Sequence, residues 1–442
     1  MAGSPPRKCR SSIACFHTVM LVLLIGCTTA QAATPTPRAS APTATEVLET
    51  PTSTPPQETP TSVPPPTSSP FVPKAVIKIA SHGPLSGNQA IFGTDMLRGA
   101  QLAVTQLAGP LAEKGYKLEL VSYNDGNNLD TAAANTIETI ADREILCSVG
   151  HLTARITVPM SELYHQAGLA LIAPFTTTPN LTDRRYREIN RMIGRDDRQG
   201  IAGAMFAKDQ GINNVYIVSE RDQYGLKNAE YFRLQADSTN IQVLGMVVIG
   251  RNDTVEKVVP RVLVSNPELI YFAGRVDQAL LFFKEARAAG FTGTFLGIDD
   301  LNNPALIESA GPSLLEGGGM YFTILTPPAI LYPVAAEFIE IFELYYNSSP
   351  LLFAARAYDA VGMCIKAIEN ASNAKGGAVP TREDVVNAIR LLKDYEGITG
   401  TYTFNRQGDK TLMQYYVFEV TSSDPAEWDQ DNIVASYDVT PP

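Results

Sequence analysis

The sequence predicts an α/β protein of two lobes, each built on a doubly wound parallel sheet. From residue 74 onward, short β-prone apolar runs alternate with segments of helical periodicity, which is typical of parallel strands covered on both faces. These units are too numerous for one comfortable sheet, so two lobes are the economical arrangement. The chain is also long enough for two cores, since 45% of its 442 residues are hydrophobic.

The first 73 residues indicate an export signal followed by a tether. Three basic residues precede an apolar stretch that is densest over residues 19–25, shorter than the roughly 20 residues that span a bilayer. The stretch ends in Leu-Ile-Gly-Cys, which resembles the bacterial lipoprotein box. We therefore expect a lipoprotein signal peptide at residues 1–26 and a lipid on Cys27; an ordinary signal peptide with a chance cysteine is the alternative. Residues 27–73 are rich in Thr, Pro and Ser and are expected to form an extended tether with a reach of roughly 100 Å.

The alternating region predicts its elements in order. The first strand is expected at residues 75–80, and Met96, Ala100 and Ala103 mark the buried face of the helix that follows. Further strands are expected at residues 117–123, 145–149, 169–173, 215–218, 243–249, 269–272 and 294–297. Helices are expected between them at residues 130–142, 157–167, 199–208, 226–236, 255–264 and 278–289.

The last third of the chain has a different pattern. Three helices are expected at residues 334–346, 354–370 and 382–392. Two strands follow, at residues 400–404 and 415–419, and the turn at 405–409 suits a hairpin connection between them.

The net charge and the absence of several sequence motifs exclude some classes of function. The net charge of −11 argues against a nucleic-acid partner, which requires a basic surface. The sequence contains no metal-ligand spacing, no phosphate loop, no dinucleotide fingerprint and no nucleophile elbow. We therefore expect no metal, no cofactor and no enzymatic activity; the alternative is an enzyme that uses the adjacent acids Asp299 and Asp300.

The loops that follow the strands are the expected ligand site, because open parallel sheets bind ligands beyond the carboxyl ends of their strands. These loops contain hydroxyls, aromatic rings, two arginines and carboxylates. That mixture suits a zwitterionic or polar metabolite. The loops are residues 86–92, 151–157, 175–178, 223–225, 274–277 and 299–300.

Eleven short segments occur in a fixed order over nearly all of residues 74–420. They are IKIASHGPLSG, FGTDMLRGAQLAV, VGHLTARIT, LIAPFTTTPNLT, GRDDRQG, DQYG, YFAG, FFKEARAAGF, FLGIDD, AYDA and GITGTYTFNRQGD. This series resembles the branched-chain amino-acid-binding (leucine/isoleucine/valine-binding) family of periplasmic solute-binding proteins, which have a type I fold.

The resemblance implies two lobes that close around a ligand and are joined by a three-segment hinge. The crossings are expected near residues 191–196, 321–324 and 398–401. One lobe would combine residues 74–193 with 323–398, and the other would combine residues 194–322 with 399–442.

The resemblance also implies individual ligand contacts. Thr177 matches the threonine that holds the ends of the ligand, Tyr224 the tyrosine of the second lobe, and Asp299 the acid that pairs with the ligand ammonium. Phe92 matches the aromatic residue of the side-chain pocket, and Phe175 lies in the same loop as Thr177. The alternatives are a helix cap for Thr177, a turn or helix cap for Asp299, core packing for Phe92 and a surface position for Tyr224.

Two departures from the family pattern bear on the ligand. Ala154 stands where the family often has a serine, so only its backbone N–H can grip a carboxylate, and the neighbouring Arg155 could take over that role. Arg275 stands where a tyrosine is common and could clamp a carboxylate in a bidentate manner. Two arginines in the cleft would favour an anionic ligand; the alternative is that one or both point to solvent.

We therefore expect an extracytoplasmic, membrane-anchored lipoprotein, monomeric, that captures an amino acid or a similar small polar metabolite for the permease and ATPase subunits of an ABC importer. The alternatives are a ligand sensor that feeds a receptor, a binder of an anionic carboxylate or amide, and a surface lipoprotein with a decayed cleft. Cys147 and Cys364 both fit buried core positions, and a disulfide between them stays open in an exported protein.

Overall fold

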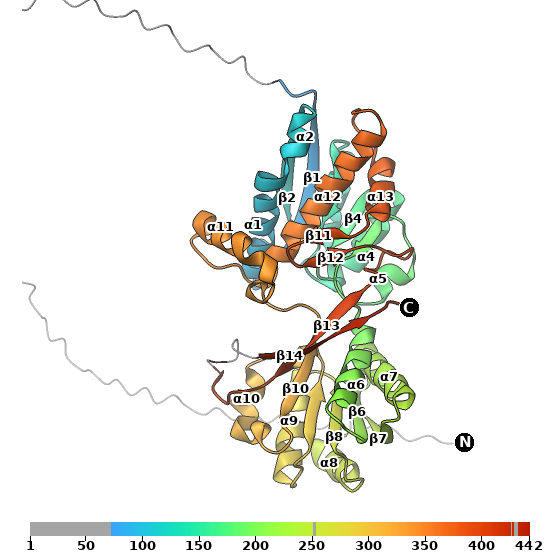
Figure 1. The fold of residues 1–442 in the computed structure, drawn as a ribbon, viewed down its shortest axis with the longest axis vertical. Coiled ribbons are helices and arrows are strands. Elements are labelled where there is room, and N and C mark those ends of the chain that lie inside the picture. Colours follow the sequence, from blue (N-terminus) through green and yellow to red (C-terminus); the bar gives the residue numbers. More distant parts are fainter. Residues whose placement is uncertain (1–71, 251–252, 426, 428–431) are drawn as a thin grey trace, which may run out of the picture. The chain divides into compact units, whose positions relative to one another are not determined.

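The computed structural model describes residues 72–250, 253–425, 427 and 432–442. The expected signal peptide, Cys27 and the tether up to residue 71 lie outside the described residues. The compact unit Pro70–Pro442 contains two large sheets with helices on both faces (Figure 1), which confirms the predicted fold class. Among the described helices, none combines the length and hydrophobicity of a membrane span.

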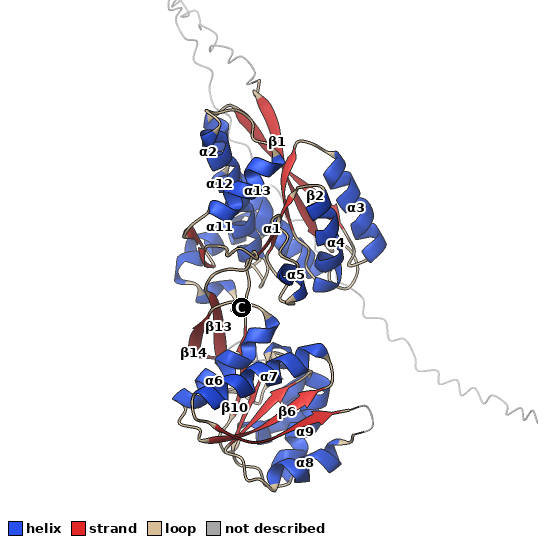
Figure 2. Ribbon diagram, turned by 90° about the vertical axis from the view of Figure 1, so that its right-hand side faces the viewer, coloured by secondary structure: helices blue, strands red, loops and turns tan. Residues whose placement is uncertain are grey.

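The first sheet is entirely parallel, in the order β2-β1-β3-β4-β5. Both faces of the sheet are covered: α1, α12 and α13 pack on one face, and α3 and α4 on the other. Figure 2 shows these two helical layers. The elements are β1 (Ala75–Gly83), α1 (Ala90–Leu107), α2 (Gly109–Glu113), β2 (Tyr116–Asn124), α3 (Leu129–Ala141), β3 (Ile145–Val149), α4 (Ala154–Gln166), β4 (Ala170–Ala173), α5 (Asn180–Asp183), β5 (Ile189–Arg191), α11 (Ala336–Tyr346), α12 (Ala354–Ala374) and α13 (Arg382–Leu391).

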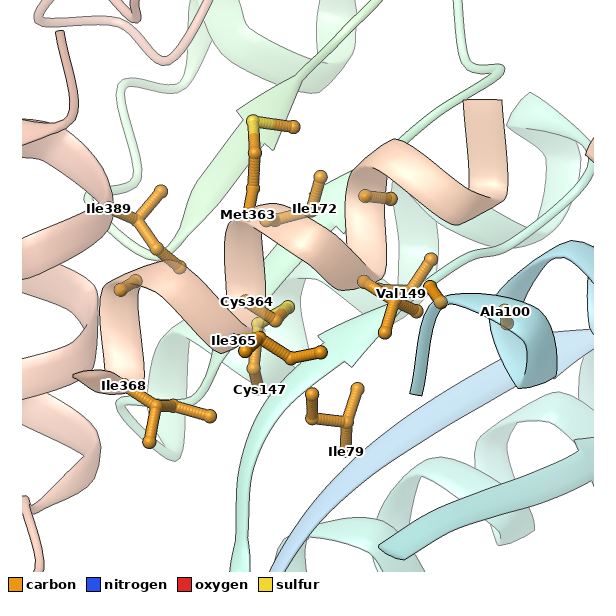
Figure 3. Close-up of a cluster of buried hydrophobic side chains, with 14 of the residues drawn as sticks. Ile79, Ala100, Cys147, Val149, Ile172, Met363, Cys364, Ile365, Ile368 and Ile389 are labelled. Carbon is orange, nitrogen blue, oxygen red and sulfur yellow. A yellow bond between two sulfur atoms is a disulfide. The ribbon is translucent and has the colours of Figure 1, made fainter. Parts of the chain in front are cut away.

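A disulfide joins the first sheet to its covering helix. Cys147 of β3 and Cys364 of α12 are bonded, with their Cα atoms 6.0 Å apart, and both residues are fully buried. Figure 3 shows the bond among aliphatic side chains that include Ile79, Ile172 and Ile365. The sequence had left this pairing open, and the structure places the two cysteines together although 217 positions separate them in the chain.

The second sheet is mixed, in the order β14-β13-β10-β9-β8-β6-β7. Strands β6 to β10 are parallel, whereas β13 is antiparallel to β10 and β14 is antiparallel to β13. Helices α8 and α9 pack on one face, and α6 and α7 on the other. The elements are α6 (Gln199–Asp209), β6 (Asn214–Glu220), α7 (Gln223–Ser238), β7 (Gln242–Ile249), α8 (Val255–Leu263), β8 (Leu269–Ala273), α9 (Val276–Ala288), β9 (Thr294–Gly297), α10 (Ala305–Ala310), β10 (Met320–Ile324), β13 (Met413–Glu419) and β14 (Asn432–Val439).

The predicted hairpin of residues 400–404 and 415–419 is wrong. β12 (Gly400–Tyr402) pairs with β11 (Tyr395–Gly397), whereas β13 joins the second sheet. The reason is packing: Tyr402 and Phe404 are buried in the core of the first sheet, and Phe418 is buried in the core of the second. The predicted turn does form, because Asn405 Oδ1 accepts the backbone N–H groups of residues 407, 408 and 409.

The chain passes between the two sheets three times. The first passage follows Arg191 at the end of β5, as expected. The second passage follows Ile324 at the end of β10, so residues 321–324, where the crossing was predicted, belong to the strand itself. The third lies between Phe404 and Met413 rather than at 398–401, since Phe404 still packs in the first core. Ile193, Leu325 and Met413, one from each passage, share a buried apolar cluster.

Candidate functional site

The predicted polar residues gather beyond the carboxyl ends of parallel strands. Thr177 follows β4, Tyr224 opens α7 after β6, and Asp299 follows β9. The Tyr224 hydroxyl donates to Asp299 Oδ1, and Gln199 Nε2 donates to the same oxygen at 2.7 Å. The structure thus brings Tyr224 and Asp299 together, as the sequence predicts for a shared site.

Asp196 completes this group and was not among the predicted residues. Its backbone N–H donates to the Thr177 carbonyl at 3.0 Å. Asp196 therefore lies beside Thr177, and its carboxyl is near enough to Asp299 to be affected by the negative charge of that residue. The signal was present in the segment GRDDRQG, whose first aspartate is Asp196.

Asp196 and Asp299 are neighbouring carboxyl groups whose pKa values are both raised, so that each is a weaker acid than usual. Burial, and then the negative charge of Asp299, raise the pKa of Asp196 to about 7. Burial also raises the pKa of Asp299, although the hydrogen bonds from Tyr224 and Gln199 oppose the shift. Two partly buried carboxylates that repel each other provide a favourable place for a cationic group such as an ammonium.

The capping alternatives for Thr177 and Asp299 do not hold. The short helix α5 begins at Asn180, and the residue that precedes it is Pro179, so Thr177 does not cap it. The helix-capping carboxylate is that of Asp300, whose Oδ2 accepts the Val276 N–H at 2.8 Å at the start of α9. Asp299 instead directs its carboxylate to Tyr224 and Gln199.

A polar pocket of about 320 Å³ lies at this group. It is lined by residues of the loop after β4 and by residues of the second sheet's loops. Its lining residues are Thr178, Pro179, Asp196, Asp197, Asp222, Gln223, Tyr224, Lys227 and Arg275.

The two arginines are already engaged by the protein. Arg275 lies 3.2 Å from Asp222 and 3.7 Å from Asp300, with its guanidinium 5.6 Å from the centre of the Tyr224 ring. Arg155 is exposed and donates to the Asn127 carbonyl at 2.9 Å. Of the two, only Arg275 reaches the polar pocket, and its charge there is balanced by two carboxylates.

Ala154 is the first residue of α4 and is partly buried. The preceding Thr153 does not cap the helix with its side chain, because its hydroxyl donates to Asn127 Oδ1 at 2.7 Å. A helix start without a side-chain cap is a favourable position for a ligand carboxylate.

The predicted aromatic residues meet through a third ring. Phe353, which immediately precedes α12, lies 5.2 Å from Phe92 and 4.9 Å from Phe175 between ring centres. Phe353 and Phe92 also line an apolar pocket of about 690 Å³ with Ile324 and Leu352. The sequence did not identify Phe353, because an aromatic residue before a helix carries no signal of its own.

A buried ionic network supports the loop that carries Thr177. Arg191 is fully buried and donates to the carbonyls of Thr176 at 3.2 Å and Thr178 at 2.6 Å. Its guanidinium lies 2.8 Å from Asp409, and Asp409 lies 3.4 Å from Arg195. Asp409 belongs to the third passage between the sheets, so this network ties the ligand loop to the hinge.

Comparison with known proteins adds independent information. The family model described as "Periplasmic binding protein" matches residues 76–425. A leucine-, isoleucine-, valine-, threonine- and alanine-binding protein of Pseudomonas aeruginosa is 28% identical over 346 residues, which cover 78% of this chain and 89% of that protein. A Leu/Ile/Val-binding protein of Escherichia coli is 27% identical over 350 residues, 78% of this chain and 90% of that protein. A leucine-binding protein from Thermotoga maritima has the same fold, with a TM-score of 0.61 and 24% identity over 81% of this chain and 98% of that one.

Proposed function

The chain belongs to the periplasmic binding protein family. From this premise we propose that it is the extracytoplasmic substrate-binding lipoprotein of an ABC importer. We further propose that its ligand is an amino acid with an apolar side chain. The observation that carries the proposal is the group of Thr177, Asp196, Tyr224 and Asp299 beyond the strand ends. The relatives are themselves named as amino-acid-binding proteins. This supports capture and delivery to a permease and ATPase rather than chemistry.

The charges of the site support a zwitterionic ligand. Asp196 and Asp299 offer negative charge to an ammonium group, and the start of α4 at Ala154 offers backbone N–H groups to a carboxylate. Arg275 is neutralised by Asp222 and Asp300, which argues against the anionic ligand considered from the sequence. The ring cluster of Phe92, Phe175 and Phe353 supports an apolar side chain on the ligand.

The location is part of the proposal. The Cys147–Cys364 disulfide supports an oxidising compartment outside the cytoplasm, where such bonds persist. The lipid on Cys27 and the tether would hold the domain near the membrane that contains the permease.

The direct test is calorimetry and thermal unfolding of the purified protein, stripped of ligand, against amino acids, dicarboxylates, amides and aromatic acids. A ligand at 100 times its Kd adds about 2.7 kcal/mol to the free energy of unfolding. We expect responses to neutral apolar amino acids; a response to acidic compounds alone would refute the zwitterion assignment. Uptake of the labelled ligand by cells that lack the protein then separates an importer from a sensor, since only the importer's loss abolishes uptake.

Asp299→Asn is expected to weaken binding of such an amino acid by about 3 kcal/mol, or roughly 100-fold, because the ammonium loses a buried charged partner. Calorimetric titration measures the change. Asp237→Asn is the matched control, since this exposed carboxylate of α7 pairs with Arg233 and does not line the pocket, so the affinity should stay within about twofold. Equal losses in both variants would contradict the assignment of Asp299.

Affinity is also expected to depend on pH through Asp196. Below its pKa of about 7 this carboxyl is protonated and cannot pair with an ammonium, whereas above that value it is charged. The affinity should therefore rise roughly tenfold from about pH 6 to about pH 8, with proton release on binding at the lower pH. Calorimetry in buffers of different ionisation enthalpy measures both effects. Asp196→Asn should bind more weakly and with a flat profile, and a flat profile in the unaltered protein would contradict the prediction.

A further inference from the structure

A small cavity lies where the three passages between the sheets come together, away from the ligand residues described above. Met192 and Gly194 contribute from the first passage, Leu325 from the second and Lys410 from the third, and Gln414 contributes from the start of β13. Arg356 of α12 also faces it, with Tyr332, Thr399 and Tyr416. The cavity has a volume of about 10 Å³, which is the space that a single water-sized particle occupies.

Two cations face this cavity, and no carboxylate within the described part of the chain forms an ion pair with either of them. Arg356 is only 4% exposed, and its terminal nitrogens donate to the Met192 carbonyl at 3.4 Å, to the Tyr332 hydroxyl at 3.2 Å and to Thr326. Its Nε is buried and has no hydrogen-bond partner. The Lys410 ammonium is partly buried and lies 4.6 Å from the centre of the Tyr402 ring.

Two acids, Asp359 and Asp438, act on these cations through their charge alone, without an ion pair among the described residues. Asp359 is fully buried, but its two oxygens accept the backbone N–H groups of Ile398 and Thr399, each at 2.8 Å, and the Thr399 hydroxyl. Asp438 is exposed on β14 and forms no ion pair with Lys410 among the described residues. Buried charges in proteins are normally paired, because an unpaired charge loses its hydration without compensation. Burial and the charge of Arg356 accordingly lower the pKa of Lys410 to about 8.

We propose that this cavity binds one monoatomic anion, chloride under physiological conditions, between Lys410 Nζ and Arg356 Nε. Lys410 Nζ and Arg356 Nε provide the charge and the donors, and Tyr332 and Tyr416 line the same space. The small volume excludes phosphate, sulfate and organic carboxylates. The proposal is independent of the amino-acid ligand, because the cavity and the polar ligand pocket share no lining residue.

The first test is the line width of ³⁵Cl in NMR spectra of the ligand-free full chain. The unaltered protein should broaden the chloride signal, and bromide should reverse the broadening by competition. Lys410→Met should reduce the broadening at least fivefold, whereas Lys284→Met, which removes an exposed lysine of α9, should leave it unchanged. Absence of broadening by the unaltered protein, or equal broadening by the Lys410→Met variant, would overturn the proposal and indicate a water molecule instead.

A second measurement uses the unaltered protein, so its outcome does not depend on whether a variant folds. Crystals of the unaltered protein grown in bromide should show an anomalous peak between Lys410 and Arg356. Bromide peaks elsewhere on the molecule with none in this cavity would overturn the proposal.

Discussion

Replacing Cys147 and Cys364 together by alanine is expected to lower the free energy of unfolding by about 5 kcal/mol, the largest effect predicted for this protein. The disulfide joins residues 217 positions apart, and the entropy that a cross-link removes from the unfolded chain grows with the length of the loop that it closes. Urea denaturation followed by circular dichroism measures the loss. Dithiothreitol should reduce the stability of the unaltered protein to about the value of the double variant.

The control separates the cross-link from the packing of its sulfur atoms. Both cysteines are fully buried among aliphatic side chains, so alanine also leaves a small cavity (Figure 3). Cys147→Val with Cys364→Ala refills part of that volume without restoring the bond. Recovery of most of the lost stability by this variant would show that packing, and not the cross-link, is responsible.

Asp409→Asn is expected to cost about 3 to 5 kcal/mol of stability, because it removes the anion from a buried ionic network while preserving its shape. Arg191 and Asp409 are at most 1% exposed and lie 2.8 Å apart, and Thr182 Oγ1 donates to the same carboxylate at 2.8 Å. Loss of the charge leaves Arg191 buried without an ion-pair partner among the described residues. Because Arg191 also holds the carbonyls of Thr176 and Thr178, ligand affinity should fall as well. Thermal unfolding and calorimetry measure the two effects.

Asp183→Asn provides the matched control within the same network. Asp183 pairs with Arg195 at 2.8 Å, but its side chain is 52% exposed, so the loss should stay below about 1 kcal/mol. Similar small losses in both variants would show that the buried pair of Arg191 and Asp409 contributes little.

The sequence predicted the parts of the fold that depend on local periodicity. The strands at 75–80 and 145–149 are short β-prone runs rich in aliphatic residues, and the structure confirms them as parallel strands covered on both faces. The final strand β14 was missed because exposed and partly exposed residues alternate along it, so it lacks the apolar run of a central strand. The false hairpin arose because neighbouring strands in the chain belong to different sheets, and only long-range packing of Tyr402 and Phe418 distinguishes them.

The candidate site shows the same division. Tyr224 and Asp299 lie in segments that match the family pattern, so the resemblance alone could locate them, and the structure brings them into contact. Arg191, Asp409 and Phe353 could not, because their roles depend on contacts between parts of the chain that are far apart in sequence. The arginines at 155 and 275 were conspicuous in the sequence, yet their partners, Asn127 and Asp222, are visible only in three dimensions.

The order of elements along the chain has a consequence for biogenesis. The apolar face of β1 and β3 is covered by α1, α12 and α13, and the last two follow the whole run from β6 to β10 in sequence. A chain that is synthesised from its N-terminus therefore presents this face without α12 and α13 until residues 354–391 have emerged. During that interval Cys147 has no Cys364 to pair with, and the uncovered apolar strands around it are prone to aggregation. A chain truncated before residue 354 would leave the same face permanently open.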